Sequence, residues 1–144
     1  MLTLYWRSFI KQPKKEEYIF YQGEKFKVEF YFTETGEMPA KEYLEKESLG
    51  VQLKLATLVK YIADHGKFFN KTKFRIVDSK ERIFEFKPAE HRFFSFFYEG
   101  SKIIITNAYR KKSQKVSKRD LEKAKNIKIA YTDRLKEGVY YEKN

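Results

Sequence analysis

The segment RFFSFFYEGSKIIITNAY, residues 92–109, decides the fold of this chain. Two strongly apolar runs, 92–98 and 102–109, flank a short polar stretch that contains Gly100. Aromatic and β-branched side chains favour strands, and glycine supplies the positive φ that a tight hairpin turn requires. The segment therefore predicts an antiparallel β-hairpin, which we expect at the centre of a small sheet.

The sequence on either side of the hairpin predicts more strands and three helices. Apolar residues recur at helical spacing over 49–65, and Gly66 is suited to end that helix. A short helix begins at Pro39, and a terminal helix begins after Ser117. The further strands are 25–32, 74–77 and 82–87. The fold class is α+β, a small twisted antiparallel sheet with two helices in the N-terminal half and a C-terminal helix, all packed on one face.

The length of 144 residues suits a single domain with extensions. Residues 1–25 have a weaker pattern and are predicted to form an accessory N-terminal arm or an added edge strand. Residues 26–138 form the main domain, and 139–144 form a C-terminal tail. The arm is assigned no chemistry.

The charge balance bounds the partners of the protein. Lys and Arg number 31 against 20 Asp and Glu, a net charge of +11, which favours a polyanion: nucleic acid, a phospholipid surface or an acidic protein. The chain has no cysteine and two histidines, so we expect neither disulfides nor a metal site, and no cofactor. It lacks long apolar runs, which predicts a cytoplasmic protein without a membrane span or signal peptide.

The basic segment 107–124, NAYRKKSQKVSKRDLEKA, raises a question about helix capping. Ser117 is the expected N-cap, with Asp120 completing a shortened capping box. Lys118 and Arg119 would then lie in the first turn, where the helix dipole disfavours cations by ~0.3 to 1 kcal/mol each. Binding of an RNA backbone by the loop and the helix start together would explain them, and a merely solvated loop is the alternative. The cations that would bind the RNA are Lys111, Lys112, Lys115, Lys118 and Arg119.

The ordered motifs resemble a known family. VEFYFTETGEMPAKEYLEK, RIFEFK and HRFFSFFYEGSKIIITNAYRKKSQKVSKRDLEKA look like the phage-derived, HigB-like branch of the RelE/ParE toxin superfamily, over about residues 26–136. In that branch a strand and two helices precede an E-hydrophobic-R/K strand. An arginine-led hairpin strand follows, then a hydrophobic strand that ends in an aromatic, a basic pair and a polar pair before the last helix.

The resemblance implies a RelE-like fold and the toxin of a type II toxin-antitoxin pair. Such toxins are typically metal-independent endoribonucleases that cut mRNA on the ribosome. A cognate antitoxin, usually a helix-turn-helix DNA-binding protein in this branch, holds them inactive. The expected partners are therefore that antitoxin, mRNA and the ribosome.

RNA cleavage without a metal needs few protein groups, because the 2′-hydroxyl of the RNA is itself the nucleophile. The protein must orient the linkage, neutralise the phosphorane and move two protons. Arg92 is the candidate phosphate clamp, since it matches the arginine that the family places at the hairpin. Lys87 is a candidate base or phosphate contact, its pKa lowered by neighbouring cations. Lys111 and Lys112 match the basic pair, and either could protonate or hold the leaving 5′-oxygen.

Other residues are weaker candidates. Tyr109 could stack on a base or be buried in the strand, and Arg110 could hold the RNA backbone. His91 is a possible acid or base because the ordinary pKa of histidine is near neutrality. His65 is expected to cap a helix end. Residues 113–120 contain neither the Tyr nor the His that some relatives place behind the basic pair, so the general acid is unassigned.

Two alternatives remain from the sequence. One is a ParE-like inhibitor that binds a protein target such as gyrase without hydrolysis. The other is a catalytically inactive, phage-derived nucleic-acid-binding protein.

Overall fold

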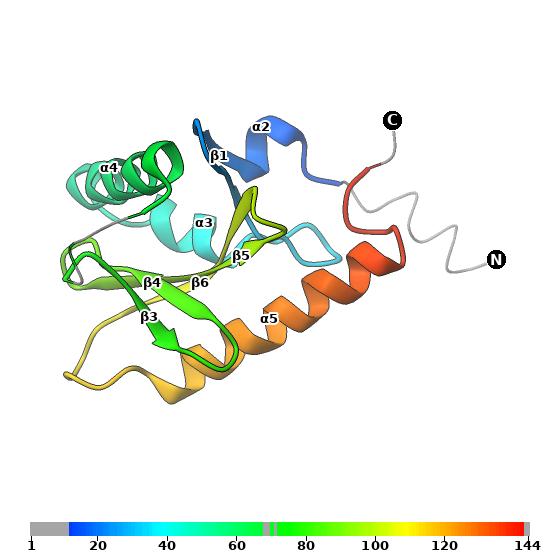
Figure 1. Ribbon diagram of the computed structural model, residues 1–144. Helices are drawn as coiled ribbons and strands as arrows, with labels where there is room; N and C mark the ends of the chain where they lie inside the picture. Colours follow the sequence, from blue (N-terminus) through cyan, green and yellow to red (C-terminus); the bar gives the residue numbers. More distant parts are fainter. Residues whose placement is uncertain (1–11, 68–69, 71, 143–144) are drawn as a thin grey trace.

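The computed structural model describes residues 12–67, 70 and 72–142. A six-stranded sheet is covered by helices on both faces (Figure 1). The elements in chain order are α2 (Lys15–Tyr18), β1 (Ile19–Gln22), β2 (Lys27–Phe30), α3 (Pro39–Glu45), α4 (Leu49–His65), β3 (Phe74–Asp78), β4 (Ile83–Phe86), β5 (His91–Tyr98), β6 (Lys102–Arg110) and α5 (Lys118–Lys136). The α+β class is confirmed.

The hairpin β5–β6 lies at the centre of the sheet, as the sequence predicts. The strand order is β1-β2-β6-β5-β4-β3. At the turn, Glu99 and Gly100 take φ values of 48° and 69°. One pair departs from the antiparallel expectation, because β2 runs parallel to β6, with Lys27 opposite Lys102 and Phe30 opposite Ile105. The sheet is therefore mixed.

Helix α4 has the predicted bounds. The hydroxyl of its N-cap, Ser48, accepts a hydrogen bond from the backbone N–H of Val51 at 3.3 Å. At the other end, Gly66 takes φ 77°, and its N–H donates to the carbonyl of Ile62. Left-handed backbone of this kind ends a helix at least cost when glycine occupies it. The apolar stripe of α4 packs into the core.

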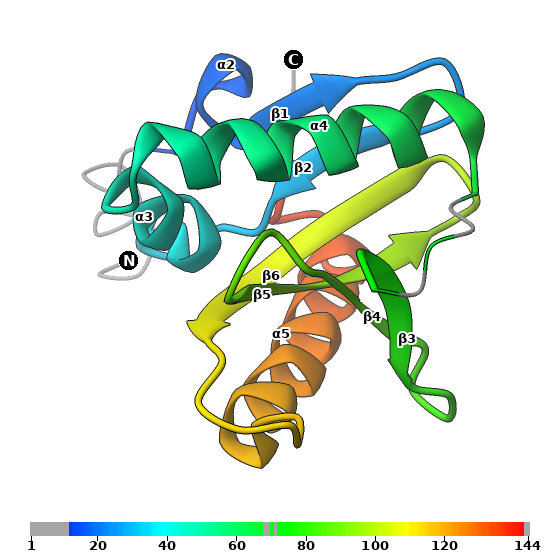
Figure 2. The ribbon, with the colours of Figure 1, turned by 90° about the vertical axis from the view of Figure 1, so that its left-hand side faces the viewer.

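The prediction that all helices cover one face of the sheet was wrong. Tyr43 of α3 packs on Phe93, whereas Tyr131 of α5 packs on Phe96, and these β5 residues point to opposite faces. Figure 2 shows α3 and α4 on one side of the sheet and α5 on the other. The physical reason is that successive residues of β5 and β6 are apolar, so both faces of the hairpin must be buried.

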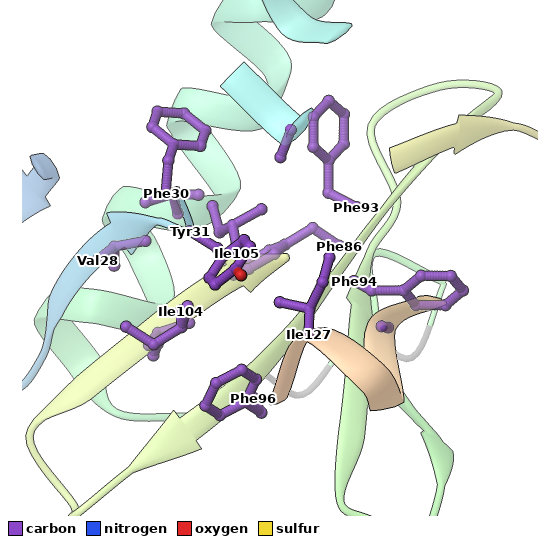
Figure 3. Close-up of a cluster of buried hydrophobic side chains, with 14 of the residues drawn as sticks. Val28, Phe30, Tyr31, Phe86, Phe93, Phe94, Phe96, Ile104, Ile105 and Ile127 are labelled. Atoms are coloured by element: carbon purple, nitrogen blue, oxygen red, sulfur yellow. The ribbon is translucent and has the colours of Figure 1, made fainter. Parts of the chain in front are cut away.

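The core accordingly fills both layers (Figure 3). Phe93, Phe94, Phe96 and Ile104 are fully buried. On the α5 side the tail joins this core, because Tyr140 is also fully buried and stacks on Phe32 with ring centroids 4.1 Å apart. The C-terminal tail, which follows α5, therefore contributes a buried side chain to the core.

Residues 1–11 of the predicted arm and 143–144 of the predicted tail lie outside the described residues. Within the described part, Ile19–Gln22 forms the edge strand β1 and pairs with β2. The division of the chain at residues 25 and 138 remains a prediction.

Candidate functional site

Charged side chains from three strands share the sheet face on which α5 begins. In an antiparallel pair, residues opposite one another point to the same face. Arg92 lies opposite Tyr109, and Glu85 lies opposite both Phe94 and Arg75. The ring of Tyr109 packs near that of Phe94, with centroids 5.5 Å apart. These side chains therefore converge on one face.

The guanidinium of Arg92 is held in place by backbone carbonyls. Its Nη1 donates to the carbonyl oxygens of Ala89 and His91, both at 2.9 Å. Ala89 takes a positive φ of 54° in the turn between β4 and β5, which brings its carbonyl to Arg92. Arg92 is 7% exposed and makes no other hydrogen bond within residues 12–67, 70 and 72–142. Its Nε and Nη2 groups therefore have no hydrogen-bond partner among the described residues.

Glu85 is a functional candidate that the sequence reasoning missed. It is fully buried, and its Oε1 accepts a hydrogen bond from Nε of Arg75 at 2.9 Å. Its Oε2 has no hydrogen-bond partner in the described part of the chain. A buried carboxylate with a free acceptor oxygen is costly unless cations compensate it. The sequence signal for Glu85 was its position two residues before Lys87 in FEFK, since residues two apart in an extended segment point to the same side.

The pKa of Lys87, which follows β4, is shifted by the charges on this face. Burial lowers the pKa of its ammonium, and the positive charges of Arg75, Arg92 and Lys111 lower it further, against the opposing effect of Glu85. The direction follows because burial and like charges both disfavour the charged form. Two other predicted catalytic residues, Arg92 and Lys111, therefore act electrostatically on Lys87. We call Arg75, Glu85, Lys87, Arg92 and Lys111 the cation cluster.

Tyr109 joins this face to the start of α5. Its hydroxyl accepts a hydrogen bond from the backbone N–H of Ser117 at 3.3 Å, and burial raises its pKa. Ser117 is the predicted N-cap, and its hydroxyl accepts from the N–H of Asp120 at 3.3 Å. In a capping box the carboxylate would accept the N–H of Ser117. Here it accepts the Ser117 hydroxyl at 2.5 Å, and Tyr109 takes the N–H.

The basic loop after β6 projects into solvent. The Nζ of Lys111 lies 3.4 Å from Oε1 of Gln114, a long hydrogen bond. The Arg119 side chain is 92% exposed, with its guanidinium 4.0 Å from Asp120. The other predicted RNA contacts of this segment are also exposed: Lys112, Lys115 and Lys118. Of the cations in this segment, Lys111 belongs to the cation cluster, whereas Lys112, Lys115, Lys118 and Arg119 are not among the main charges that shift the pKa of Lys87.

Arg110 and His91 point away from Arg92. They lie opposite one another on the face that carries α3, since each neighbours a residue of the α5 face. Arg110 binds the carboxylate of Glu90 through Nη2 at 2.7 Å and Nε at 3.1 Å. Both side chains of this pair are about two-thirds exposed. Arg110 is thus an exposed residue that already pairs with a carboxylate, and its predicted contact with the RNA backbone stays a prediction.

His91 is buried in a separate polar cluster. Its Nδ1 lies 2.6 Å from the Tyr43 hydroxyl, and its Nε2 lies 3.3 Å from Oε1 of Glu47. Burial, with the charge of Glu47, raises the pKa of Tyr43 to about 12. The structure does not bring His91 together with Arg92, although the two are adjacent in sequence. His65, at the end of α4, packs its ring against Tyr61.

Two further properties concern metals and membranes. Among the described residues, no group of three or more His, Cys, Asp or Glu side chains is arranged to hold a metal ion. None of the helices in that part of the chain has the length and apolar content needed to cross a bilayer.

These features define a class: an α+β chain with a mixed six-stranded sheet whose central hairpin and last helix frame a cluster of cations. The family model described as "Phage derived protein Gp49-like (DUF891)" matches residues 42–128, more than half of the chain. The chain belongs to this Gp49-like family, which falls broadly among the RelE/HigB-like toxins. The match includes Glu85, Lys87 and Arg92. No curated protein matches the chain.

Proposed function

We propose that this protein is the toxin of a type II toxin-antitoxin system and cleaves mRNA on the ribosome, within the HigB-like branch. The observation that carries the proposal is the cation cluster, in which Arg92 is held rigidly and Lys87 has a lowered pKa. Preorganised cations of this kind are what a phosphorane requires, because its negative charge grows in the transition state. Family membership supports the assignment to toxins.

Arg92 is the proposed clamp for the non-bridging phosphate oxygens. Its Nη1 is occupied by two carbonyls, which fixes the plane of the guanidinium and leaves its other N–H groups for phosphate. A fixed planar fork suits the bidentate geometry of phosphate better than an ammonium does. Loss of one preorganised donor of this type commonly lowers the rate by ~10² to 10³.

The cleavage step needs one base and one acid. A base takes the proton of the 2′-hydroxyl while O2′ forms a bond to phosphorus and the bond from phosphorus to O5′ breaks. O5′ then receives a proton, and the products are a 2′,3′-cyclic phosphate and a 5′-hydroxyl. Lys87 in its neutral form is the proposed base, since its lowered pKa enlarges that fraction. Lys111 or Lys112 protonates or stabilises the leaving oxygen. His91 is less suited, because it lies on the other face of the sheet.

The exposed cations of the loop are the proposed contacts to the RNA and ribosomal RNA backbone. They need no burial for this role, because phosphate binding releases counterions and works at an exposed surface. The contacts are Arg110, Lys115, Lys118 and Arg119. Tyr109 holds this loop through Ser117, and its half-buried ring is the proposed stacking surface for a base. A cytoplasmic location and a helix-turn-helix antitoxin complete the proposal.

Induced expression in a bacterium tests the proposal. We expect rapid arrest of translation and cut mRNA with the unaltered chain, and loss of both with Arg92→Ala. Arg92→Lys distinguishes bidentate binding from charge alone, and Lys80→Ala, an exposed lysine in the β3–β4 turn, is the matched control. DNA damage without mRNA cleavage would instead support a gyrase inhibitor. No effect on growth would support an inactive nucleic-acid-binding protein.

A further inference from the structure

Helix α4 exposes two large apolar side chains on its outer surface. Leu49 and Leu53 are 68% and 58% exposed and lie one turn apart on the same side of the helix. Full burial of a leucine side chain is worth about 1.5 to 3 kcal/mol, and most of that free energy is not gained while these two side chains remain exposed. Leucines scattered singly need no explanation. Here, however, they border grooves.

Leu53 forms the ridge between two grooves. One groove, with a volume of about 320 Å³, runs between α4 and the turn that follows β4, and its apolar lining includes Leu53, Leu58, Pro88 and Ala89. The other, with a volume of about 340 Å³, extends from Leu53 past Leu49 toward α2 and α3. Leu53 is the residue that lines both grooves, and the second groove also carries Glu16, Glu17 and Glu45, so the first is the one that suits an acidic partner.

Cations line the first groove. Lys54, Lys73 and Lys87 all contribute to it, and no carboxylate does. In the described part of the chain, none of the three forms an ion pair with an acidic side chain. An apolar floor with three unpaired lysines is complementary to a segment that presents apolar side chains flanked by carboxylates.

We propose that this groove, defined by Leu53, Lys54, Lys73, Lys87 and Ala89, binds an acidic amphipathic helix of a partner protein. The helix lays its apolar stripe along Leu53 and Pro88 and pairs its carboxylates with the lysines. Helix-in-groove recognition places apolar anchors at i, i+3 or i+4, and i+7 on one side of the bound helix, and Leu53, Leu58 and Pro88 offer an apolar surface for them.

The groove and the cation cluster share Lys87, so a bound partner would affect the cluster. This part of the inference rests on the proposed function. Ala89 lines the groove and its carbonyl holds Nη1 of Arg92 at 2.9 Å. Lys87 belongs to both the groove and the cluster. A bound carboxylate that pairs with Lys87 favours its protonated form and so removes the neutral amine that the proposed cleavage step needs. Occupation of the groove therefore inhibits the site.

A labelled peptide of about 16 residues tests the binding without any RNA. It carries leucines at helical spacing with glutamates beside them, and its binding to the full chain is followed by fluorescence anisotropy. Leu53→Glu and Lys54→Glu should each weaken the affinity by more than about tenfold, and higher salt should weaken binding to the unaltered chain. Ile129→Glu is the matched control, because Ile129 on α5 is also 58% exposed. A peptide with Gln in place of Glu should bind less tightly.

Several results would overturn the proposal. Equal loss of peptide binding in Leu53→Glu and Ile129→Glu would show that the groove is not the site. A dimer in sedimentation equilibrium that Leu53→Glu dissociates would assign the surface to a second copy of the chain. Displacement of the peptide from the unaltered chain by single-stranded RNA, with Lys54→Glu weakening RNA binding as much as peptide binding, would assign the groove to nucleic acid. Peptide binding at the groove with no RNA cleavage by the chain would contradict only the proposed function.

Discussion

The hydroxyl of Tyr109 accepts the backbone N–H of Ser117, which links the last residues of the central hairpin to the first turn of α5. This contact fixes both ends of the basic loop 110–117. Since Ser117 is also the N-cap of α5, helix capping and placement of the loop depend on the same residue. The cations of this loop are thus attached to the sheet at one end and to the helix at the other.

Tyr109→Phe removes that hydrogen bond while keeping the ring. We expect the free energy of unfolding to fall by about 0.5 to 1.5 kcal/mol, the usual net value of one hydrogen bond, in urea denaturation. RNA binding should also weaken, because the loop is no longer held. Ser117→Ala provides the comparison, and loss of a serine N-cap typically costs about 0.5 to 2 kcal/mol. Unchanged stability in both variants would contradict this description of the helix start.

Glu85→Gln removes the one carboxylate that lies within the cation cluster. The change leaves Arg75 without its charged partner and the neighbouring cations uncompensated. We expect a loss of about 1 to 3 kcal/mol of unfolding free energy, as for a buried polar group whose partner is altered. Glu90→Gln, which breaks an exposed ion pair, should change stability far less. Equal effects of the two variants in thermal or chemical denaturation would show that burial of Glu85 is unimportant.

The pH dependence of cleavage follows from Lys87. If neutral Lys87 is the base, the rate rises with pH until the ammonium is deprotonated, and its lowered pKa places that rise below the ordinary lysine value of about 10.4. Arg75→Ala removes a positive charge and frees the Glu85 carboxylate, and both changes favour the protonated form. The rise should therefore move to higher pH, as measured by the rate between about pH 6 and 10. A shift to lower pH, or no shift, would exclude Lys87 as the base.

Tyr140→Phe tests whether the tail is part of the fold. The Tyr140 hydroxyl accepts the backbone N–H of Phe32 at 3.0 Å, and both groups are buried. Without it the N–H has no partner, which typically costs about 1 to 3 kcal/mol. Denaturation in urea at neutral pH gives the value. A neutral effect would mean that water or another acceptor replaces the hydroxyl.

Local patterns predicted much of the fold. Helical periodicity and Gly66 fixed the bounds of α4, and Gly100 with its two apolar flanks fixed the central hairpin. The parallel pairing of β2 with β6 could not be predicted, because alternation within a strand does not specify its neighbour or direction. The presence of a helix on the second face was missed although it could have been predicted, because the consecutive apolar residues of β5 and β6 require both faces to be buried. Which helix covers which face does not follow from that pattern.

The site was predicted only in part. Arg92, Lys87 and Lys111 were proposed from residue type and resemblance, and the charges of Arg92 and Lys111 lower the pKa of Lys87. Their catalytic roles stay a prediction. Glu85 was missed because an acidic residue in a strand usually faces solvent, and its pairing with Arg75 depends on strand register. His91 could not be assigned to the opposite face before the pairing of β5 with β6 was known.

The most direct test uses an mRNA whose cleavage site has been mapped on ribosomes with the purified chain. A single 2′-deoxy substitution is then placed at the nucleotide on the 5′ side of the cut. We predict that the unmodified mRNA yields a 2′,3′-cyclic phosphate end, that Arg92→Ala lowers its cleavage by ~10² or more, and that the substituted mRNA is not cut at that site. Cleavage of the 2′-deoxy substrate at the original rate would contradict a mechanism in which the RNA supplies its own nucleophile.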